Sequence, residues 1–244
     1  MRSNNPVLDR VEKLNEEVND RASYKGIAIK TGILFMIVVL SAFLSLTLAV
    51  VQTNLWVILL TVSPILAFVF AMIGQISIKL AKPMSILYSI FEGVTLGALS
   101  FLVNALIENA AFIALTVTLT IFAVMLILYS SKTIRVGNKF RRFMYASSLS
   151  LLLAFIIFFV ADLVSGGTLF ASSNIGILIG ISLFLIFYGA LMLLMDFDRA
   201  TYLVEFGVDS RVEWNISLGL ILSLVWIYVE VLRLIILVVA RNDK

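Results

Sequence analysis

Seven apolar stretches of about twenty residues each constrain this chain more than any other feature of its sequence. They cover residues 31–51, 55–78, 84–107, 110–129, 144–164, 175–195 and 216–240. An α-helix rises about 1.5 Å per residue, so about 20 apolar residues cross a hydrocarbon layer about 30 Å thick. The sequence therefore predicts an all-α integral membrane protein built as a bundle of seven spanning helices.

The composition leaves little sequence for any other kind of domain. Of the 244 residues, 61% are hydrophobic and 14% are charged, whereas soluble domains are about 45–50% apolar and about 25% charged. We expect one transmembrane domain over residues 31–240 and a short tail at 241–244. Residues 1–30 are predicted to form a cytoplasmic amphipathic segment, because apolar residues recur there at helical spacing, namely Val7, Leu8, Val11, Leu14 and Val18. That segment lacks the pattern of a removable signal peptide.

The chain contains neither cysteine nor histidine. The missing cysteine excludes disulfides, thiolate nucleophiles and cysteine-bound metals, and the missing histidine removes the usual general base and the commonest metal ligand. We therefore expect no enzymatic activity and no cofactor, and no metal site is certain. The net charge of +3 is spread over loops, so we expect contact with the lipid bilayer and none with nucleic acid.

The basic residues indicate how the helices are oriented. If the N-terminus is cytoplasmic, fifteen of the 18 lysines and arginines fall in cytoplasmic segments, and the three outer loops hold none. This is the bias that the positive-inside rule describes. We expect a multi-pass protein of the cell membrane with its N-terminus in the cytoplasm and its C-terminus outside.

The last apolar stretch carries polar residues along one helical face. Gly219, Ser223, Trp226, Glu230 and Arg233 follow one another at spacings of four and three residues. A charge at the centre of a bilayer costs about 2.5 to 3.5 kcal/mol on insertion scales, so this face should turn toward protein. We expect Glu230 and Arg233 to form a structural ion pair that holds the last helix in register, with a role as an outer gate as the alternative.

Small residues mark the places where helices are predicted to touch. Gly93 and Gly97 are four residues apart in the third stretch, and Gly176 and Gly180 are four apart at the start of the sixth. Gly219 lies on the polar face of the last stretch. Such spacing is typical of close helix packing in membranes, and we assign these glycines to packing.

A tight turn is predicted between the last two helices. The sixth helix should continue past Met195 and stop at Gly207, a residue type that favours the position after a helix end. The pattern Ser210-x-x-Glu213 is typical of a capping box that starts the seventh helix. We therefore expect a cytoplasmic hairpin.

Four segments together resemble a known family. They are YKGIAIKTGIL, AKPMSILYSIFEGVTLGALS, MDFDRATYLVEFG and EWNISLGLILSLVWIYVEVLRLI. The chain resembles the transmembrane Bax inhibitor motif family, in particular its bacterial branch. The resemblance implies a bundle in which six helices surround the seventh, with a pH-sensitive calcium leak in some members and a regulatory or protective role in others. It implies no enzymatic reaction.

The resemblance also implies which acidic residues matter. The family uses one aspartate at the end of the sixth helix, which the motif FDRA places at Asp198, and a second in the seventh helix. The second position, about ten residues before Leu232-Arg233, holds Ser223 here. The family often pairs these acids with an arginine in the second span, and this second span has no basic residue before Lys79.

Glu92 is a candidate for the missing acid. It should lie roughly 12 Å deep from the cytoplasmic side, at a depth similar to that of Ser223. Together with Asp196 or Asp198 it would form an acidic cluster. Two carboxylates in a low-dielectric site cannot both ionise at low cost, so such a pair would act as a proton switch, and its oxygen atoms would suit calcium. Alternatively, the two aspartates are solvated interfacial charges and Glu92 is a hydrogen-bonded packing residue.

Two functions follow from these observations. The first is a cation leak, with calcium or protons as the permeant or regulatory ions, gated by protonation of the acidic cluster. The second is a regulator that transports nothing and binds other membrane proteins, such as a membrane protease.

Overall fold

The computed structural model describes residues 21–51, 53–134, 136–166 and 174–242. Seven helices are found in this part of the chain, and all seven are long and apolar enough to cross a membrane. They are α2 (Tyr24–Val51), α3 (Thr53–Ile76), α4 (Ala81–Leu106), α5 (Ala110–Ser130), α6 (Asn138–Val164), α8 (Ile175–Glu205) and α9 (Val212–Asn242). The predicted all-α membrane bundle is confirmed. The apolar residues assigned to an amphipathic helix, Val7 to Val18, lie outside the described residues.

Some helices are longer than their apolar stretches. The first begins at Tyr24, so residues 24–30 belong to α2 rather than to a separate surface segment. The sixth continues to Glu205, ten residues beyond Met195, as the sequence predicts. These extensions carry polar residues, and they build most of the site described below.

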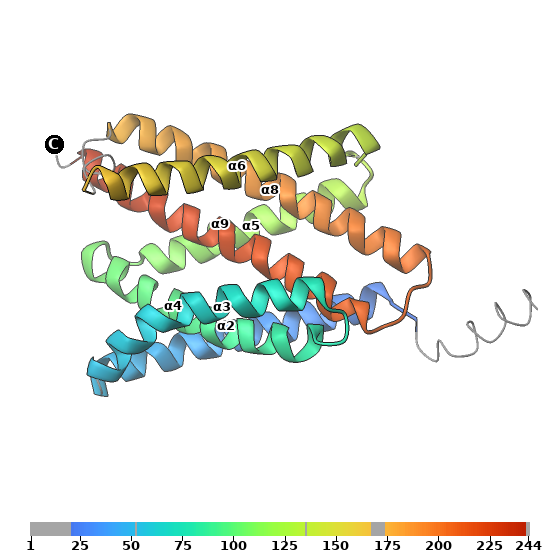
Figure 1. The fold of residues 1–244 in the computed structure, drawn as a ribbon, viewed down its shortest axis with the longest axis horizontal. Helices are drawn as coiled ribbons and strands as arrows, with labels where there is room; N and C mark the ends of the chain where they lie inside the picture. Colours follow the sequence, from blue (N-terminus) through green and yellow to red (C-terminus); the bar gives the residue numbers. More distant parts are fainter. Residues whose placement is uncertain (1–20, 52, 135, 167–173, 243–244) are drawn as a thin grey trace, which may run out of the picture.

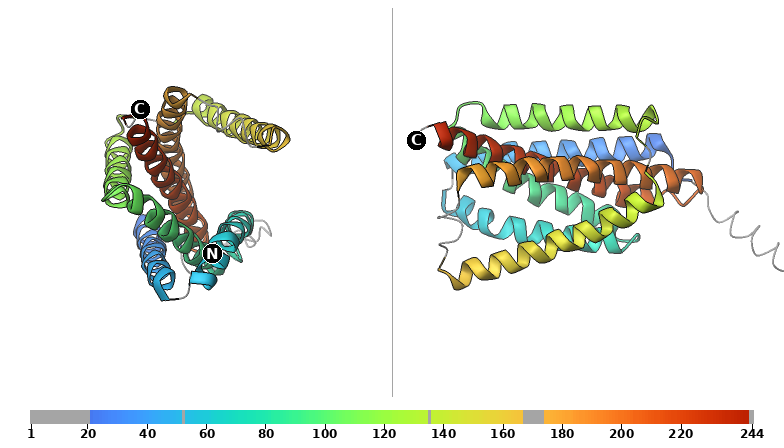
Figure 2. Two further views of the ribbon diagram at one scale, coloured as in Figure 1. Left: turned by 90° about the vertical axis from the view of Figure 1, so that its left-hand side faces the viewer. Right: turned by 90° about the horizontal axis from the view of Figure 1, so that it is seen from above.

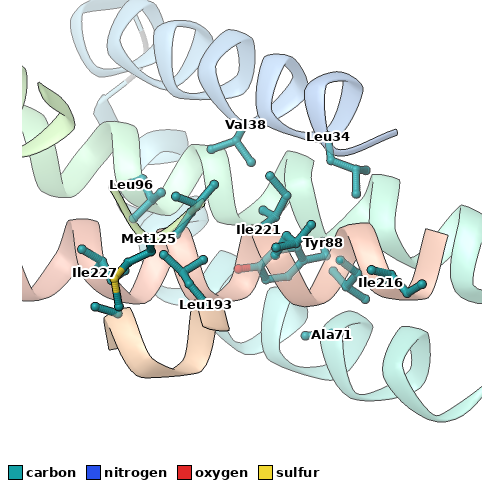
Figure 3. Close-up of a cluster of buried hydrophobic side chains, with 14 of the residues drawn as sticks. Leu34, Val38, Ala71, Tyr88, Leu96, Met125, Leu193, Ile216, Ile221 and Ile227 are labelled. Carbon is teal, nitrogen blue, oxygen red and sulfur yellow. The ribbon is translucent and has the colours of Figure 1, made fainter. Parts of the chain in front are cut away.

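The last helix, α9, is the centre of the bundle. It packs against α2, α3, α4, α5 and α8, and in Figure 1 it runs between the other helices from one end of the molecule to the other. Its side chains Ile216, Ile221 and Ile227 are at most 2% exposed. Figure 3 shows these side chains beside Leu193 of α8 and Tyr88 of α4.

The bundle has two distinct ends. The turn between α8 and α9 and the start of α2 lie at the end drawn at the right of Figure 1, which we call the hairpin end. The C-terminal end of α9 lies at the other.

Helix α6 departs from the arrangement of six helices around a seventh. Met144, Ser147 and Ser148 join it to α8 by hydrogen bonds, and Arg141 joins it to α8 by an ion pair. Met144 is the one residue of α6 that is buried, and its side chain packs with Tyr188 and Met195 of α8. Figure 2 shows α6 projecting to one side of the bundle. Helix α6 is therefore attached through α8 and does not cover α9.

The glycines fall into two groups. A Cβ atom on Gly93 would lie 2.7 Å from Cβ of Ser41, and one on Gly97 would lie 2.7 Å from Cα of Ala42, so α4 and α2 approach closely at both glycines. The assignment of Gly176 and Gly180 to helix packing is wrong. Among the residues that the structure describes, a Cβ on Gly180 would meet nothing within 4 Å, and one on Gly176 would meet only Asn174, whose side chain caps its own helix.

The hairpin turn is a Schellman motif, as the glycine predicts. Gly207 has φ +64°, its N–H donates to the carbonyl of Val204 at 3.0 Å, and the N–H of Val208 donates to the carbonyl of Leu203 at 3.3 Å. This pattern satisfies the last carbonyls of α8. The predicted capping box is wrong, because the Glu213 carboxylate does not turn back to Ser210 and instead contacts α2.

Candidate functional site

Glu213 joins the first turn of α9 to the first turn of α2. Its carboxylate, in a residue only 4% exposed, accepts hydrogen bonds from the backbone N–H of Ser23 at 2.7 Å and from Nζ of Lys30 at 2.5 Å. The Ser23 hydroxyl in turn accepts the N–H of Gly26 at 3.0 Å. A capping box is thus formed between two helices, with the glutamate supplied by α9. Any side chain at Gly26 would collide with the Glu213 carboxylate.

The side-chain amide of Asn215 satisfies backbone carbonyl groups at the C-terminal end of α3. Its Nδ2 donates to the carbonyl oxygens of Gly74 at 2.8 Å and Gln75 at 2.9 Å, and its Oδ1 accepts from Arg199 of α8 at 2.6 Å. The last carbonyls of a helix need such partners when they are buried. Asn215, at 2% exposure, therefore ties three helices together.

Asp196 of α8 and Ser223 of α9 form a direct polar contact between the two helices. The Ser223 hydroxyl donates to Oδ2 of Asp196 at 2.5 Å. Gly219 makes room for the carboxylate, since a Cβ there would lie 3.2 Å from Oδ1 of Asp196. The serine at the family's second acidic position thus meets Asp196, and not the Asp198 to which the motif points.

Asp198 lies on the other side of α8 and pairs with α6. Its Oδ2 is 2.6 Å from NH2 of Arg141 and accepts from Nε at 2.8 Å. The guanidinium carbon of Arg141 lies 5.7 Å from the ring centre of Tyr202, within the range of a cation–π contact. An arginine does pair with the acid of the FDRA motif, but it comes from α6 rather than from the second span.

Glu92 joins neither of these pairs. It is half-buried on α4, and among the described residues it has no hydrogen-bond or ion-pair partner. Helix α4 packs against α2, α3, α5 and α9, while both aspartates belong to α8. The expected cluster of Glu92 with Asp196 or Asp198 is therefore not formed. No group of three acidic residues in the described part of the chain lies close enough to hold a metal ion.

A cavity of about 530 Å³ opens at the hairpin end beside these groups. The end of α3, the start of α6, the end of α8 and the start of α9 line it, and its polar side chains include Arg141, Asp198, Arg199 and Asn215. The Asp198–Arg141 ion pair therefore forms part of a cavity wall between α6 and the rest of the bundle.

The exposed turn of the hairpin carries a different ion pair. Arg211 donates to both carboxylate oxygens of Asp209, at 2.8 Å and 3.0 Å for the shortest contacts. These hydrogen bonds lower the pKa of Asp209 to about 2. Asp209 therefore stays charged throughout the physiological pH range.

Glu230 and Arg233 lie far from the hairpin end. NH1 of Arg233 is 3.8 Å from Oε1 of Glu230, which is longer than a hydrogen bond. Glu230 is 9% exposed, and neither its Oε2 nor the buried hydroxyl of Ser182 has a partner at normal hydrogen-bond geometry among described residues. The two charges face each other on one side of α9 as a loose pair.

The residues missed by the sequence interpretation are Glu213 and Asn215 as links between helices, and Arg141 as the partner of Asp198. The sequence does contain a signal for Glu213 and Asn215, because both are polar residues in the first turn of a mostly apolar helix. Arg141 gave no such signal, since it lies among several basic residues at the start of α6.

Together the fold and this site define a multi-pass α-helical membrane protein with a buried central helix and a polar network at one end. The family model for Bax inhibitor 1 like proteins matches residues 5–240. This chain belongs to that family, which confirms the family-level resemblance found in its motifs. Searches of curated proteins and of solved structures found no match.

Proposed function

We propose that this protein is a pH-sensitive cation leak of the cell membrane, with calcium as a permeant ion and the hairpin end facing the cytoplasm. The observation that carries the proposal is the ion pair between Asp198 and Arg141, which attaches the loosely packed α6 to α8 beside a polar cavity. The bias of basic residues toward the hairpin end supports the orientation.

The leak is closed in the arrangement described above. Leu193, Ile216 and Ile221 are at most 2% exposed and pack in the apolar core of the bundle. Leu193 lies one turn before Asp196 on α8, so a shift of α8 against α9 would move it. Opening the path therefore requires the polar contacts of α8 to change.

Protonation of Asp196 supplies that change. A neutral Asp196 carries an O–H donor of its own and no longer depends on the hydroxyl of Ser223, which loosens α8 against α9. This change favours opening as the pH falls, so the leak is expected to increase in acid. The Asp198–Arg141 ion pair holds α6 against α8 until α8 moves.

Calcium is a suitable permeant ion because the acidic and amide side chains at the hairpin end offer oxygen ligands, but too few of them to bind the ion tightly. Calcium binds tightly where six to eight oxygen ligands surround it. Conduction instead requires contacts weak enough for the ion to leave. We assign Glu92, which has no hydrogen-bond or ion-pair partner among the described residues, to this path as a transient contact rather than to the switch.

Flux from liposomes tests the proposal. Purified protein in vesicles that contain a calcium-sensitive dye should leak faster at pH 5.5 than at pH 7.5. Asp198→Asn should leak at the fast rate at both pH values, because an amide cannot hold Arg141 by charge. Asp209→Asn is the matched control and should keep the wild-type profile, since Asp209, with its pKa lowered to about 2, remains charged at both pH values.

The variant Glu92→Gln tests whether Glu92 contacts the permeant ion or takes part in the pH-dependent opening. It should lower the flux at every pH and leave the pH of half-maximal flux unchanged. A shift of that midpoint in Glu92→Gln would place Glu92 in the switch instead.

The alternative function is a regulator that binds other membrane proteins, and the position of α6 favours it. Large apolar side chains on several faces of this helix are exposed, among them Phe155 at 65% and Ile157 at 68%. A partner helix could pack there as well as lipid does. Vesicles that stay as tight as protein-free vesicles at both pH values would reject the leak and favour this function.

A further inference from the structure

A second cavity lies inside the bundle, away from the hairpin end. Its volume is about 380 Å³, and α2, α4, α5 and α9 line it. Val38, Leu96 and Ile221, from three of these helices, are labelled in Figure 3. The volume falls within the range of about 300 to 1,000 Å³ that is typical of ligand pockets.

The pocket has a buried floor and an exposed rim. Leu96, Ile221 and Leu224 form the floor and are 1% to 7% exposed. Three phenylalanines form the rim, one each from α2, α4 and α5, namely Phe43 at 64%, Phe101 at 41% and Phe112 at 70% exposure. The pocket is therefore open toward the surface that these membrane-spanning helices present to lipid.

The hydroxyl groups of the pocket are already satisfied within the protein. Ser100 donates its hydroxyl proton to the carbonyl of Leu96 at 2.5 Å, so Tyr228 is the donor in the 2.6 Å contact between the Tyr228 and Ser100 hydroxyls. Thr118 donates to the carbonyl of Ala114 at 2.8 Å. These hydroxyl groups have no proton left to donate to a ligand. Asn104, an exposed residue of the lining, accepts the N–H of Ala111 with its Oδ1 at 2.9 Å.

We propose that this pocket binds one acyl chain of a membrane phospholipid. The rim is continuous with the lipid-facing surface of three membrane-spanning helices, so acyl chains are the molecules that surround its opening. The hydrophobic effect gives an acyl chain no reason to leave the bilayer for the pocket, because both are apolar. Binding in the pocket is therefore favoured by close van der Waals packing of the chain against the lining side chains. The headgroup stays outside the phenylalanine rim.

The bound chain contacts the central helix at a sensitive position. Ile221 and Leu224 flank Ser223, whose hydroxyl contacts Asp196 on the opposite side of α9. The acyl chain therefore packs against the same turn of α9 that contacts α8. This site is independent of the proposed leak and exists whether or not the protein conducts ions.

Photo-crosslinking tests the site. The full chain is incorporated into vesicles with a phospholipid that carries a diazirine near the end of one acyl chain, and the labelled residues are mapped by mass spectrometry. Saturable labelling of Ile221 and Leu224 is expected, because lipid reaches these buried residues only through the pocket. Trp226 is left out of the comparison, since it is 47% exposed and meets bulk lipid. Labels confined to exposed residues, such as those of α6, would overturn the proposal.

A variant and a competition experiment provide the controls. Leu224→Trp fills the pocket and should reduce the labelling of Ile221 at least fivefold, whereas Leu153→Trp, at an exposed position of α6, should leave it unchanged. If Leu224→Trp does not fold, unlabelled phospholipid with straight chains should displace the label from the wild-type protein, and phospholipid with methyl-branched chains should not. Equal competition by both lipids would also overturn the proposal.

Discussion

At the scale of single residues, the polar side chains of this protein serve mainly to end and join helices. Glu213 and Asn215 satisfy backbone groups of α2 and α3 from the first turn of α9. Buried backbone groups need partners, and each helix end has several to satisfy. Placing those partners on the central helix fixes its neighbours at the hairpin end.

Replacing Glu213 tests this role. Glu213→Gln removes the charge that Lys30 contacts at 2.5 Å, and both side chains are largely buried, at 5% and 19% exposure. Breaking one partner of a buried pair typically costs about 3 to 5 kcal/mol, so a clear fall in thermal stability in detergent is expected. Asp209→Asn is the control, because its ion pair with Arg211 is on the surface and should add little. Equal stability of the two variants would contradict the role of Glu213.

Glu230 and Arg233 give a second test at this scale. Glu230→Gln or Arg233→Met alone should lower thermal stability, because each leaves one charge in the apolar part of the bundle. The double variant should recover much of the loss, since replacing both charges can be nearly neutral. A single variant with wild-type stability and altered ion flux would instead assign the pair to a gate.

At the scale of helices, the number and approximate position of the spans followed from the sequence, whereas the early start of α2 and the rotation of each helix did not. The length of an apolar stretch is a local property, so seven spans, the extension of α8 and the turn at Gly207 could be predicted. Which side chain meets which depends on how each helix is rotated. Asp196 and Asp198 are only two residues apart, yet they face α9 and α6 respectively. Spacing alone also could not separate Gly97, where an added Cβ would collide with α2, from Gly180, where an added Cβ would meet no described residue within 4 Å.

Alanine at these two glycines tests the distinction. A Cβ at Gly97 would lie 2.7 Å from Cα of Ala42, and this backbone cannot move away easily. Gly97→Ala should therefore destabilise the protein by about 1 to 3 kcal/mol, the range for overpacking. Gly180→Ala has open space and should be neutral or slightly stabilising, because alanine favours a helix more than glycine does. Thermal unfolding in detergent measures both, and a loss of stability in Gly180→Ala alone would contradict the packing described here.

At the scale of the whole molecule, an odd number of spans puts the two ends of the chain on opposite sides of the membrane. Helix α6 starts at the hairpin end and α9 finishes at the other end (Figures 1 and 2). Asn138 and Asn242 are both exposed and belong to these two opposite ends. The orientation then depends on which end carries the positive charge, and the hairpin end carries most of it.

Cysteine labelling tests that orientation in a chain that has no cysteine of its own. Asn4→Cys, Asn138→Cys and Asn242→Cys are expressed one at a time in intact cells and treated with a thiol reagent that cannot cross the membrane. Asn242→Cys should react in intact cells, while Asn4→Cys and Asn138→Cys should react only after the cells are opened. The reverse pattern would place the hairpin end, with the Asp198–Arg141 pair and the polar cavity, on the outer side of the membrane. Labelling of all three from one side would contradict seven spans.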